Sequence, residues 1–290
     1  MLKEVAIFGS DNGKATKVCI NNLLDVLKKK GIRIFIQERL KGFIGRDDKN
    51  EYTYYKNIYA EKLSPDMVLS VGGDGTFLET VLQVRDSGIP IAGVNAGRLG
   101  FLANIHDDIE GSVNKLINEE FSILSRYLIE LEQPVSIMDD AGVALNDITI
   151  QKADLNMIRI NVYVDDIFLN AYWSDGLIIS TATGSTAYNL STGGPILSPE
   201  DNSIVISPLS PHTLSVRPIV LPGNSRLKFR VESRNPEYLV TCDFRSVRLP
   251  YFKELEISQP DYRINTVNVE GQDFFSTLRN KLMWGADRRN

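Results

Sequence analysis

Short apolar runs and helix-forming stretches alternate along roughly the first hundred residues of the chain. Four runs rich in Val, Ile and other apolar residues are predicted as strands, at 4–10, 32–37, 67–71 and 89–95. The stretches at 17–31 and 77–86 repeat apolar residues three or four positions apart, which is typical of amphipathic helices. Strands that alternate with helices predict a Rossmann-like parallel sheet covered by helices, an α/β domain.

The pattern changes after about residue 105. One more helix is predicted at 108–120. The segments beyond it are rich in β-branched residues, often alternate with polar ones, and are separated by turn signals such as Asp165-Asp166. These segments are 121–133, 144–152, 157–180, 203–210, 226–233, 238–244 and 254–260. They predict an antiparallel, all-β region.

This change in pattern is the predicted domain boundary. The first, α/β domain is expected to cover 1–104, and the second, mainly β domain is expected to cover 105–267. The closing segment 268–290 contains a predicted helix at 273–285, with Phe274, Leu278 and Leu282 on one face. We expect this C-terminal helix to pack back on the first domain.

Composition places the chain among ordinary globular proteins. Its 290 residues are 43% hydrophobic and 24% charged, and the formal net charge is −5. This acidic balance argues against a protein whose main task is to bind nucleic acid, because neutralising phosphates needs a basic surface.

The cysteines and apolar runs bear on location. Cys19 and Cys242 stand far apart without a CxxC pair, which favours a reducing compartment. The N-terminal apolar run is too short for a signal peptide, and the longest uncharged run, 176–199, is too polar for a membrane span. We therefore expect a soluble, cytoplasmic protein with neither nucleic acid nor membrane as a partner.

The sequence VGGDGT at 71–76 joins a predicted strand to a predicted helix. It can be a plain turn in which Asp74 caps the helix. However, Gly72, Gly73 and Gly75 are more glycines than one turn requires, and glycine costs backbone entropy wherever it is not needed. Bare N–H groups at the start of a helix favour an anion. We therefore predict that a ligand approaches the backbone of this loop.

The loop matches neither of two familiar phosphate-binding signatures, because it lacks the lysine of GxxxxGK[ST] and the spacing of GxGxxG. A phosphate site without that lysine has to rely on N–H groups, a metal ion or remote cations. Asp74 itself would repel phosphate. Its carboxylate suits the coordination shell of magnesium or the acceptance of a proton from an attacking hydroxyl.

Other segments carry polar side chains outside any hydrophobic pattern. NAGRLGFLA at 95–103 is interpreted as a strand end, a turn and core residues. The segment 175–197 holds eight hydrogen-bonding side chains within 181–192, between apolar flanks. A polar surface loop would explain half of them, whereas buried hydroxyls need partners that a ligand rich in hydroxyl and amide groups would supply. Asn146-Asp147 fits an ordinary Asx turn or a binding pair.

Taken together, these segments resemble the NAD kinase family, whose members phosphorylate NAD to NADP. The resemblance runs over nearly the full chain, from the first strand through GGDG, NAGRLGFLA, ND, DGLIISTATGSTAYNLSTGGPI and HTLSVRP to FFSTLRNKLMWG. GGDGT alone is shared with phosphofructokinases and with diacylglycerol and sphingosine kinases. TGSTAYNLSTGGP together with the upstream ND is the specific signal.

The resemblance implies roles for particular residues. Asp74 would be the catalytic base at the 2′-hydroxyl of the adenosine ribose, and the phosphate-binding residues would be Gly72, Gly73 and Gly75. NAD-binding residues would be Asp74, Gly75, Asn146, Asp147, Asn156, Asp175, Thr183, Thr186, Ala187, Tyr188, Asn189, Leu190 and Ser191. Among them, Asn146 and Asp147 would contact ribose and base, Asp175 the nicotinamide end, and 186–191 the adenosine. Further candidates are Arg98, His212 and Arg245.

At four positions this sequence differs from the residues that the resemblance to the family leads us to expect: Asn156, Trp173, Ala182 and Arg245. They leave the implied reaction intact and bear on contacts at the rim of the pocket. The resemblance further implies Mg²⁺ or another divalent metal as cofactor, ATP or polyphosphate as donor, and a homodimer or homotetramer. The mainly β domain would bind NAD.

Two other readings remain open at this point. A lipid kinase of the diacylglycerol or sphingosine kinase type would share the glycine loop, although no amphipathic membrane face is evident in the sequence. A non-catalytic dinucleotide sensor would keep the NAD pocket and would need neither Asp74 nor magnesium.

Overall fold

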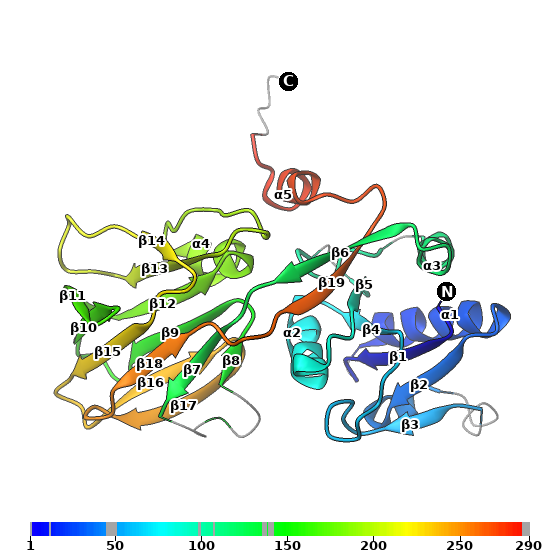
Figure 1. Ribbon diagram of the computed structural model, residues 1–290, viewed down its shortest axis with the longest axis horizontal. Coiled ribbons are helices and arrows are strands. Elements are labelled where there is room, and N and C mark those ends of the chain that lie inside the picture. The colour runs from blue at the N-terminus through cyan, green and yellow to red at the C-terminus, as the bar shows by residue number, and fades with distance from the viewer. Residues whose placement is uncertain are drawn as a thin grey trace. The chain divides into compact units, whose positions relative to one another are not determined.

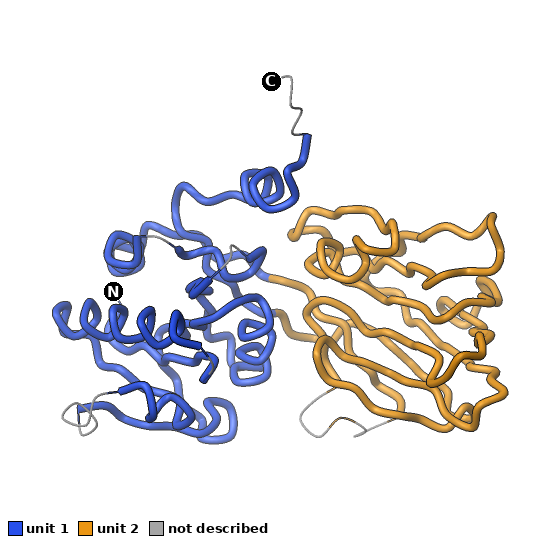
Figure 2. Tube along the Cα trace, turned by 180° about the vertical axis from the view of Figure 1, so that it is seen from behind, with its two compact units in different colours: residues 1–125, 264–290 blue, residues 126–263 orange. Residues whose placement is uncertain are grey.

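The structure is a computed structural model that describes residues 2–11, 13–44, 51–97, 100–106, 108–134, 138 and 142–285. The chain forms two compact units (Figure 2). Unit 1 contains 1–125 and 264–290, and unit 2 contains 126–263. These divisions lie after residue 125 and before residue 264, whereas the sequence placed them after 104 and 267. The reason is that the helix at Ile109–Ile117 and the strand at Phe121–Arg126 complete the first sheet and its core.

Unit 1 is an α/β unit built on one seven-stranded sheet with strand order β3-β2-β1-β4-β5-β19-β6 (Figure 1). Its strands are β1 (Glu4–Gly9), β2 (Arg33–Gln37), β3 (Thr53–Tyr55), β4 (Met67–Gly72), β5 (Ile91–Asn95), β6 (Phe121–Arg126) and β19 (Ile264–Val269). Its helices are α1 (Lys14–Lys29), α2 (Asp74–Val84), α3 (Ile109–Ile117) and α5 (Phe274–Leu282), with short 3₁₀ turns at Glu38–Gly42 and Arg85–Ser87. The pairs β3-β2, β2-β1, β1-β4, β4-β5 and β5-β19 are parallel, as predicted.

Different helices cover the two faces of this sheet. Side chains alternate between faces along a strand, so Leu69 and Val71 point one way and Ser70 points the other. Leu69 and Val71 belong to a core cluster with side chains of α1 and α3. Ser70 accepts a hydrogen bond from Thr80 Oγ1 of α2 at 2.7 Å. Helices α1 and α3 therefore pack on one face and α2 packs on the other (Figure 1).

The predicted elements of unit 1 are present, with shifted ends. Helix α1 begins at Lys14 rather than residue 17, and α2 begins at Asp74 rather than residue 77. Gly73 takes an extended backbone at the N-cap of α2, and no side chain caps this helix end. Asp74 therefore lies in the first turn of α2, and the interpretation of Asp74 as a capping residue is wrong. No helix in the described ranges is both long and apolar enough to cross a membrane.

Unit 2 contains two six-stranded sheets, ordered β11-β10-β15-β18-β7-β8 and β14-β13-β12-β9-β16-β17. The first consists of β7 (Ile129–Gln133), β8 (Val143–Ala144), β10 (Ile158–Val164), β11 (Ile167–Ser174), β15 (Leu227–Glu232) and β18 (Leu255–Ser258). The second consists of β9 (Asp147–Lys152), β12 (Gly176–Thr181), β13 (Ser203–Leu209), β14 (Ile219–Pro222), β16 (Glu237–Cys242) and β17 (Arg245–Pro250). Between β12 and β13 lie a 3₁₀ turn, η3 (Thr183–Thr186), and one helical turn, α4 (Tyr188–Ser191).

The predicted stretch 157–180 divides into β10, β11 and β12. The turn between β10 and β11 lies at Asp165-Asp166, where both residues have positive φ, 49° and 64°. The predicted turn signal is thus confirmed, and the neighbouring strands pair antiparallel as expected.

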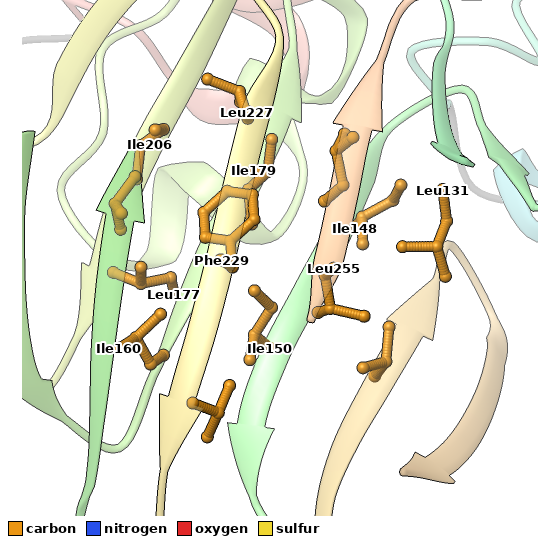
Figure 3. Packing of buried hydrophobic residues seen from close by; sticks show 14 of the residues in the cluster. Leu131, Ile148, Ile150, Ile160, Leu177, Ile179, Ile206, Leu227, Phe229 and Leu255 are labelled. Atoms are coloured by element: carbon orange, nitrogen blue, oxygen red, sulfur yellow. The ribbon is translucent and has the colours of Figure 1, made fainter. Parts of the chain in front are cut away.

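One hydrophobic core joins the two sheets of unit 2. Phe229 and Ile160 come from the first sheet, Ile150 and Ile179 come from the second, and all four are fully buried in one cluster (Figure 3). Alternation explains this arrangement, because each strand sends every second side chain inward. The β-rich architecture of the second unit is therefore a consequence of the alternating pattern in the sequence.

Truncation of the central aromatic side chain tests this core. Phe229→Ala should lower the free energy of unfolding by about 3–5 kcal/mol, because it leaves a cavity between the sheets. Phe252→Ala is the matched control, since that ring is 69% exposed and its loss should cost little. Urea denaturation of both variants measures the difference, and equal costs would contradict the packing described.

Candidate functional site

The glycine loop connects strand β4 to helix α2. Gly72 is buried, and a Cβ at this position would lie 2.3 Å from Thr76 Oγ1. Thr76 is itself buried in the first turn of α2. Packing therefore requires a glycine at position 72, independently of any ligand.

Gly73 and Gly75 are different. Both are exposed, and a Cβ on either would meet no heavy atom of the described residues within 4 Å. Neither has the positive φ that would demand glycine. The two glycines therefore leave open backbone at the start of α2, where N–H groups have no partner within the helix. This is the geometry expected if an anionic ligand approaches the chain closely.

Asp74 lies between these two glycines, and three consecutive backbone N–H groups donate hydrogen bonds to its carboxylate. Phe101 N–H donates to Oδ2 at 3.0 Å, and Leu102 and Ala103 N–H donate to Oδ1 at 3.0 and 3.1 Å. Gly100 completes the turn, because a Cβ there would lie 2.0 Å from Asp74 Oδ1. The carboxylate thus fixes the 100–103 turn, and we call this arrangement the Asp74 cradle.

The C-terminal helix contributes a fourth donor. Lys281 Nζ of α5 lies 3.1 Å from Asp74 Oδ2, and the two side chains are 31% and 30% exposed. The ammonium also lies 4.5 Å from the centre of the Phe101 ring. Helix α5 is anchored nearby, since Phe274 packs against Phe101 at 6.4 Å between ring centres and Leu278 is buried. The expected return of the C-terminal helix to the first domain is confirmed.

The electrostatics of Asp74 follow from these contacts. Burial alone would raise the pKa of its carboxyl, but the N–H groups of Phe101 and Leu102, the charge of Lys281 and the N–H group of Ala103 together hold the pKa below its usual range. Charge-assisted hydrogen bonds of this kind favour the ionised form. Asp74 is therefore a carboxylate at neutral pH.

The segment 95–103 has more than the structural role predicted for it. Its backbone forms the Asp74 cradle, while Asn95 fixes the turn by donating to Ala103 O at 3.0 Å and accepting from Gly97 N–H at 2.7 Å. Of the residues interpreted as core, Leu102 is buried, Phe101 is only partly buried, and Leu99 lies outside the described residues. The candidate Arg98 lies outside the described residues.

Unit 2 contains a second cradle around Asp243, in the turn between β16 and β17. The Asp243 carboxylate accepts hydrogen bonds from the N–H groups of Leu145, Asn146 and Asp147 at 2.9, 2.8 and 3.3 Å. In return, Asp243 N–H donates to Asp147 O at 2.9 Å. The backbone of the predicted pair Asn146-Asp147 is therefore held in place by Asp243, which follows the neighbouring strand β16. We call this arrangement the Asp243 cradle.

The two acidic residues of the Asp243 cradle affect each other. Burial raises the pKa of Asp147 to about 7, and the negative charge of Asp243 adds to this effect. Burial also raises the pKa of Asp243, although the three N–H donors and Arg245 oppose it. Because Asp243 has those donors, we assign the negative charge to Asp243 first, with Asp147 as the member that takes up a proton near neutrality.

The buried part of segment 181–192 is satisfied internally. Thr181 Oγ1 donates to Leu145 O at 2.6 Å, and Ser185 Oγ accepts from Leu197 N–H at 3.0 Å. Asn189 is fully buried; its amide donates to Ser185 O and Pro195 O, and its oxygen accepts from Ser207 Oγ at 2.6 Å. These buried groups therefore need no ligand as a partner, contrary to the prediction, because other parts of unit 2 supply their partners.

Other side chains of the same segment are exposed at the surface of unit 2. Tyr188 is 43% exposed, Ser191 is exposed, and Thr186, Ala187 and Leu190 are partly exposed. The internal hydrogen bonds of Asn189 hold this surface in place. Gly184 brings it against the Asp243 cradle, since a Cβ there would lie 2.0 Å from Asn146 O. The two motifs that carried the specific resemblance are thus neighbours within unit 2.

The remaining candidates of unit 2 all have protein partners. Their contacts are Asp175 with Lys152 Nζ at 2.7 Å, Asn156 with Asp154 Oδ2 at 3.1 Å, Thr183 Oγ1 with Arg126 at 3.1 Å, and Arg245 with Val143 O. Arg245 therefore supports the strand before the Asp243 cradle. The side chain of His212 is exposed, and the backbone N–H of this residue donates to the backbone oxygen of Trp173 at 2.9 Å.

Sequence reasoning missed three groups of the candidate site: Lys281, Asp243 and the N–H groups of 101–103. Lys281 lies in a segment interpreted only as a closing helix, although a cation from elsewhere in the chain was one of the three alternatives predicted for the glycine loop. Asp243 carried no local signal, because its partners are about 100 positions away in the chain. Backbone donors cannot be read from residue types at all.

The comparisons with known proteins cover nearly the whole chain. The family model described as ATP-NAD kinase N-terminal domain matches residues 5–121, and the one described as ATP-NAD kinase C-terminal domain matches residues 145–269. The NAD kinase of Flavobacterium psychrophilum is 40% identical, over 99% of this chain and 100% of the relative. The NAD kinase of Bacteroides fragilis is 38% identical, over 98% of this chain and 99% of the relative.

Two solved structures share the fold. The crystal structure of yeast NADH kinase complexed with NADH matches with a TM-score of 0.86 at 22% identity, over 99% of this chain and 89% of that one. The crystal structure of an NAD kinase from Archaeoglobus fulgidus in complex with ATP matches with a TM-score of 0.75 at 21% identity, over 97% and 98%. At these identities the likeness establishes a common fold.

The raised pKa of Asp147 predicts a pH dependence of stability. The carboxyl has a pKa of about 7 when folded and about 3.9 when unfolded, so the folded chain binds more protons between those values. Its contribution to the free energy of unfolding therefore falls as pH rises through this window. Asp147→Asn should stabilise the chain more at about pH 8 than at about pH 5, as measured by urea denaturation at both. An equal effect of the substitution at the two pH values would contradict the assignment.

Proposed function

This chain belongs to the NAD kinase family, and we propose that it transfers the γ-phosphoryl group of ATP to the 2′-hydroxyl of the adenosine ribose of NAD, giving NADP. The family supplies the reaction class, a phosphotransferase that acts on an alcohol group. Polyphosphate is the alternative donor. The observation that carries the assignment of the catalytic residue is the position of Asp74, an ionised carboxylate between two open glycines at the start of α2.

The proposed mechanism depends on position more than on base strength. Phosphoryl transfer passes through a loose transition state, so orientation and charge neutralisation outweigh the removal of the proton. A carboxylate with a lowered pKa is a weak base, and it can still orient a hydroxyl and accept its proton late in the reaction. The Asp74 cradle holds the carboxylate in one orientation, which is what such a mechanism requires.

Mg²⁺ or another divalent metal fits this site as a companion of the triphosphate. Among the described residues no group of three or more His, Cys, Asp or Glu side chains could hold a metal ion. Mg²⁺ needs no such cluster, because it usually keeps several waters and binds substrate phosphates with one or two carboxylates. The triphosphate oxygens and waters would be the main ligands of the ion, with Asp74 as the carboxylate of the site. The ion would neutralise part of the negative charge of the phosphates.

Unit 2 is proposed to bind the dinucleotide. The exposed ring of Tyr188 and the partly exposed Thr186, Ala187 and Leu190 form a surface suited to a nucleoside. The Asp243 cradle fixes Asn146 beside it, with an amide available for hydrogen bonding. Asn189 would support this surface from within, since its side chain forms hydrogen bonds to Ser185, Pro195 and Ser207.

Location and assembly are proposals of the same kind. Cys19 and Cys242 are both buried and free, which suits a reducing, cytoplasmic compartment. We also propose a homodimer or homotetramer, as the family resemblance implies.

The family assignment decides against the lipid kinase of the diacylglycerol type. The non-catalytic dinucleotide sensor remains the second candidate, because a binding surface can persist without turnover. It is separated from the kinase by product formation, since a sensor would bind NAD and form no NADP in the presence of ATP and Mg²⁺.

Substitution of the proposed base tests the mechanism. Purified protein incubated with NAD, ATP and Mg²⁺ should form NADP, and Asp74→Asn should lower turnover by roughly 10²-fold or more. The amide offers one acceptor atom in place of two, so we also expect a loss of stability of about 1–3 kcal/mol. NADP formation should therefore be measured well below the melting temperature of the variant. Near-normal turnover in a folded variant would rule out the base.

The open glycines provide a second test. Gly75→Ala should keep the melting temperature of the wild type or raise it slightly, because a helical position gains from losing glycine and no described atom obstructs the new methyl group. If phosphates approach this backbone, the same methyl group should lower kcat/KM for ATP by roughly tenfold or more. Gly72→Ala is the contrast, since its clash with Thr76 should destabilise the chain. A stable, fully active Gly75→Ala variant would contradict the phosphate site.

A further inference from the structure

The carboxylate of Asp74 has no vacant acceptor position. A carboxylate offers about four lone-pair sites. Leu102 and Ala103 N–H occupy two on Oδ1, while Phe101 N–H and Lys281 Nζ occupy two on Oδ2. A substrate hydroxyl that is to give its proton to Asp74 must therefore displace one of these four donors.

Only one of the four donors is free to leave. The three N–H groups belong to consecutive residues of a turn that Gly100 and Asn95 hold against the carboxylate, so removing one would disrupt the turn. Lys281 is instead a side chain on a flexible four-carbon stem, with 31% of its surface exposed. The exchangeable position of Asp74 is thus the one that Lys281 fills.

We propose that Lys281 exchanges with the acceptor hydroxyl on Asp74 Oδ2 and then contacts the transferring phosphoryl group, as the cation that the glycine loop lacks. This inference rests on the proposed function. It makes Lys281 a catalytic residue supplied by the last helix of the chain. A remote cation is one of the three ways in which a glycine loop without lysine can neutralise phosphate, beside N–H groups and a metal ion. The structure provides such a cation beside the proposed base.

The distances support this role. In a productive complex, the acceptor oxygen lies within hydrogen-bond reach of Asp74 and about 3–3.5 Å from phosphorus. An ammonium that leaves Oδ2 therefore needs to move only a few ångströms to reach a phosphoryl oxygen. The Phe101 ring, 4.5 Å from Nζ, offers a surface along which the ammonium remains stabilised during this movement.

The chemical step balances without any further reactant. The 2′-oxygen forms the new bond to the γ-phosphorus, and its proton passes to Asp74. The bond between the γ-phosphorus and the β–γ bridging oxygen breaks, with its electron pair leaving on ADP. Lys281 keeps its proton throughout and neutralises charge on the transferring group, a form of stabilisation that acts in the transition state.

A different role for the same contact makes the opposite prediction. If Lys281 only blocks Asp74, its removal should release the base and raise turnover. If it only supports α5, its removal should lower stability and leave the kinetic constants of the folded enzyme unchanged.

Three variants of the full chain separate these outcomes. Lys281→Met removes the charge and keeps the length of the side chain, and Lys281→Arg keeps the charge. Arg279→Met removes a positive charge from the same helix, where Arg279 donates to Ser276 Oγ and does not contact Asp74. NADP formation gives kcat and KM for each variant, calorimetry with NAD alone gives binding, and thermal unfolding confirms folding.

We expect kcat of Lys281→Met to fall by roughly 10²-fold, on the scale of one lost transition-state donor. Its affinity for NAD should equal or exceed that of the wild type, because the competing ammonium is gone. Lys281→Arg should recover part of kcat, and Arg279→Met should match the wild type. An unchanged or higher kcat in folded Lys281→Met would overturn the proposal. A wild type that forms no NADP would instead overturn the proposed function, so the two failures are distinct.

Discussion

One interaction recurs in both units and organises the functional part of each: a carboxylate that accepts hydrogen bonds from three consecutive backbone N–H groups. Asp74 holds residues 101–103 in this way, and Asp243 holds residues 145–147. A turn of this kind has donors that neither strand nor helix can satisfy, and an ionised acceptor is the strongest partner for them. The turn and the carboxylate therefore determine each other's positions.

The two cradles have opposite electrostatic results. Around Asp74, the N–H groups and Lys281 outweigh burial, so the pKa of the carboxyl is lowered and the group is ionised at neutral pH. In the second cradle, the N–H groups donate to Asp243. Its neighbour Asp147 is buried and is repelled by the charge of Asp243, so the pKa of Asp147 rises to about 7. The same local motif thus produces a fixed charge in unit 1 and a group that titrates near neutrality in unit 2. What differs is whether a second carboxylate shares the site.

Much of the architecture and part of the candidate site could be predicted from sequence. The parallel sheet and the β-rich unit were predictable because periodicity is a local property that survives packing. Asp74 and its glycines were predictable because residue types in a short loop report directly on backbone chemistry. The burial of Asn189 was foreseeable from flanking apolar residues, whereas its partners Ser185, Pro195 and Ser207 were not.

By itself, the sequence determined the order of strands and helices, the excess of glycine around Asp74 and the absence of a lysine from that loop. Only the tertiary structure decided which of those glycines are required by packing, which N–H groups bind the two carboxylates, and that Lys281 from the last helix reaches Asp74. The physical reason is that periodicity and composition act over a few residues. A hydrogen bond between positions 74 and 281 instead depends on how the sheet brings distant segments together, and no local pattern encodes that distance.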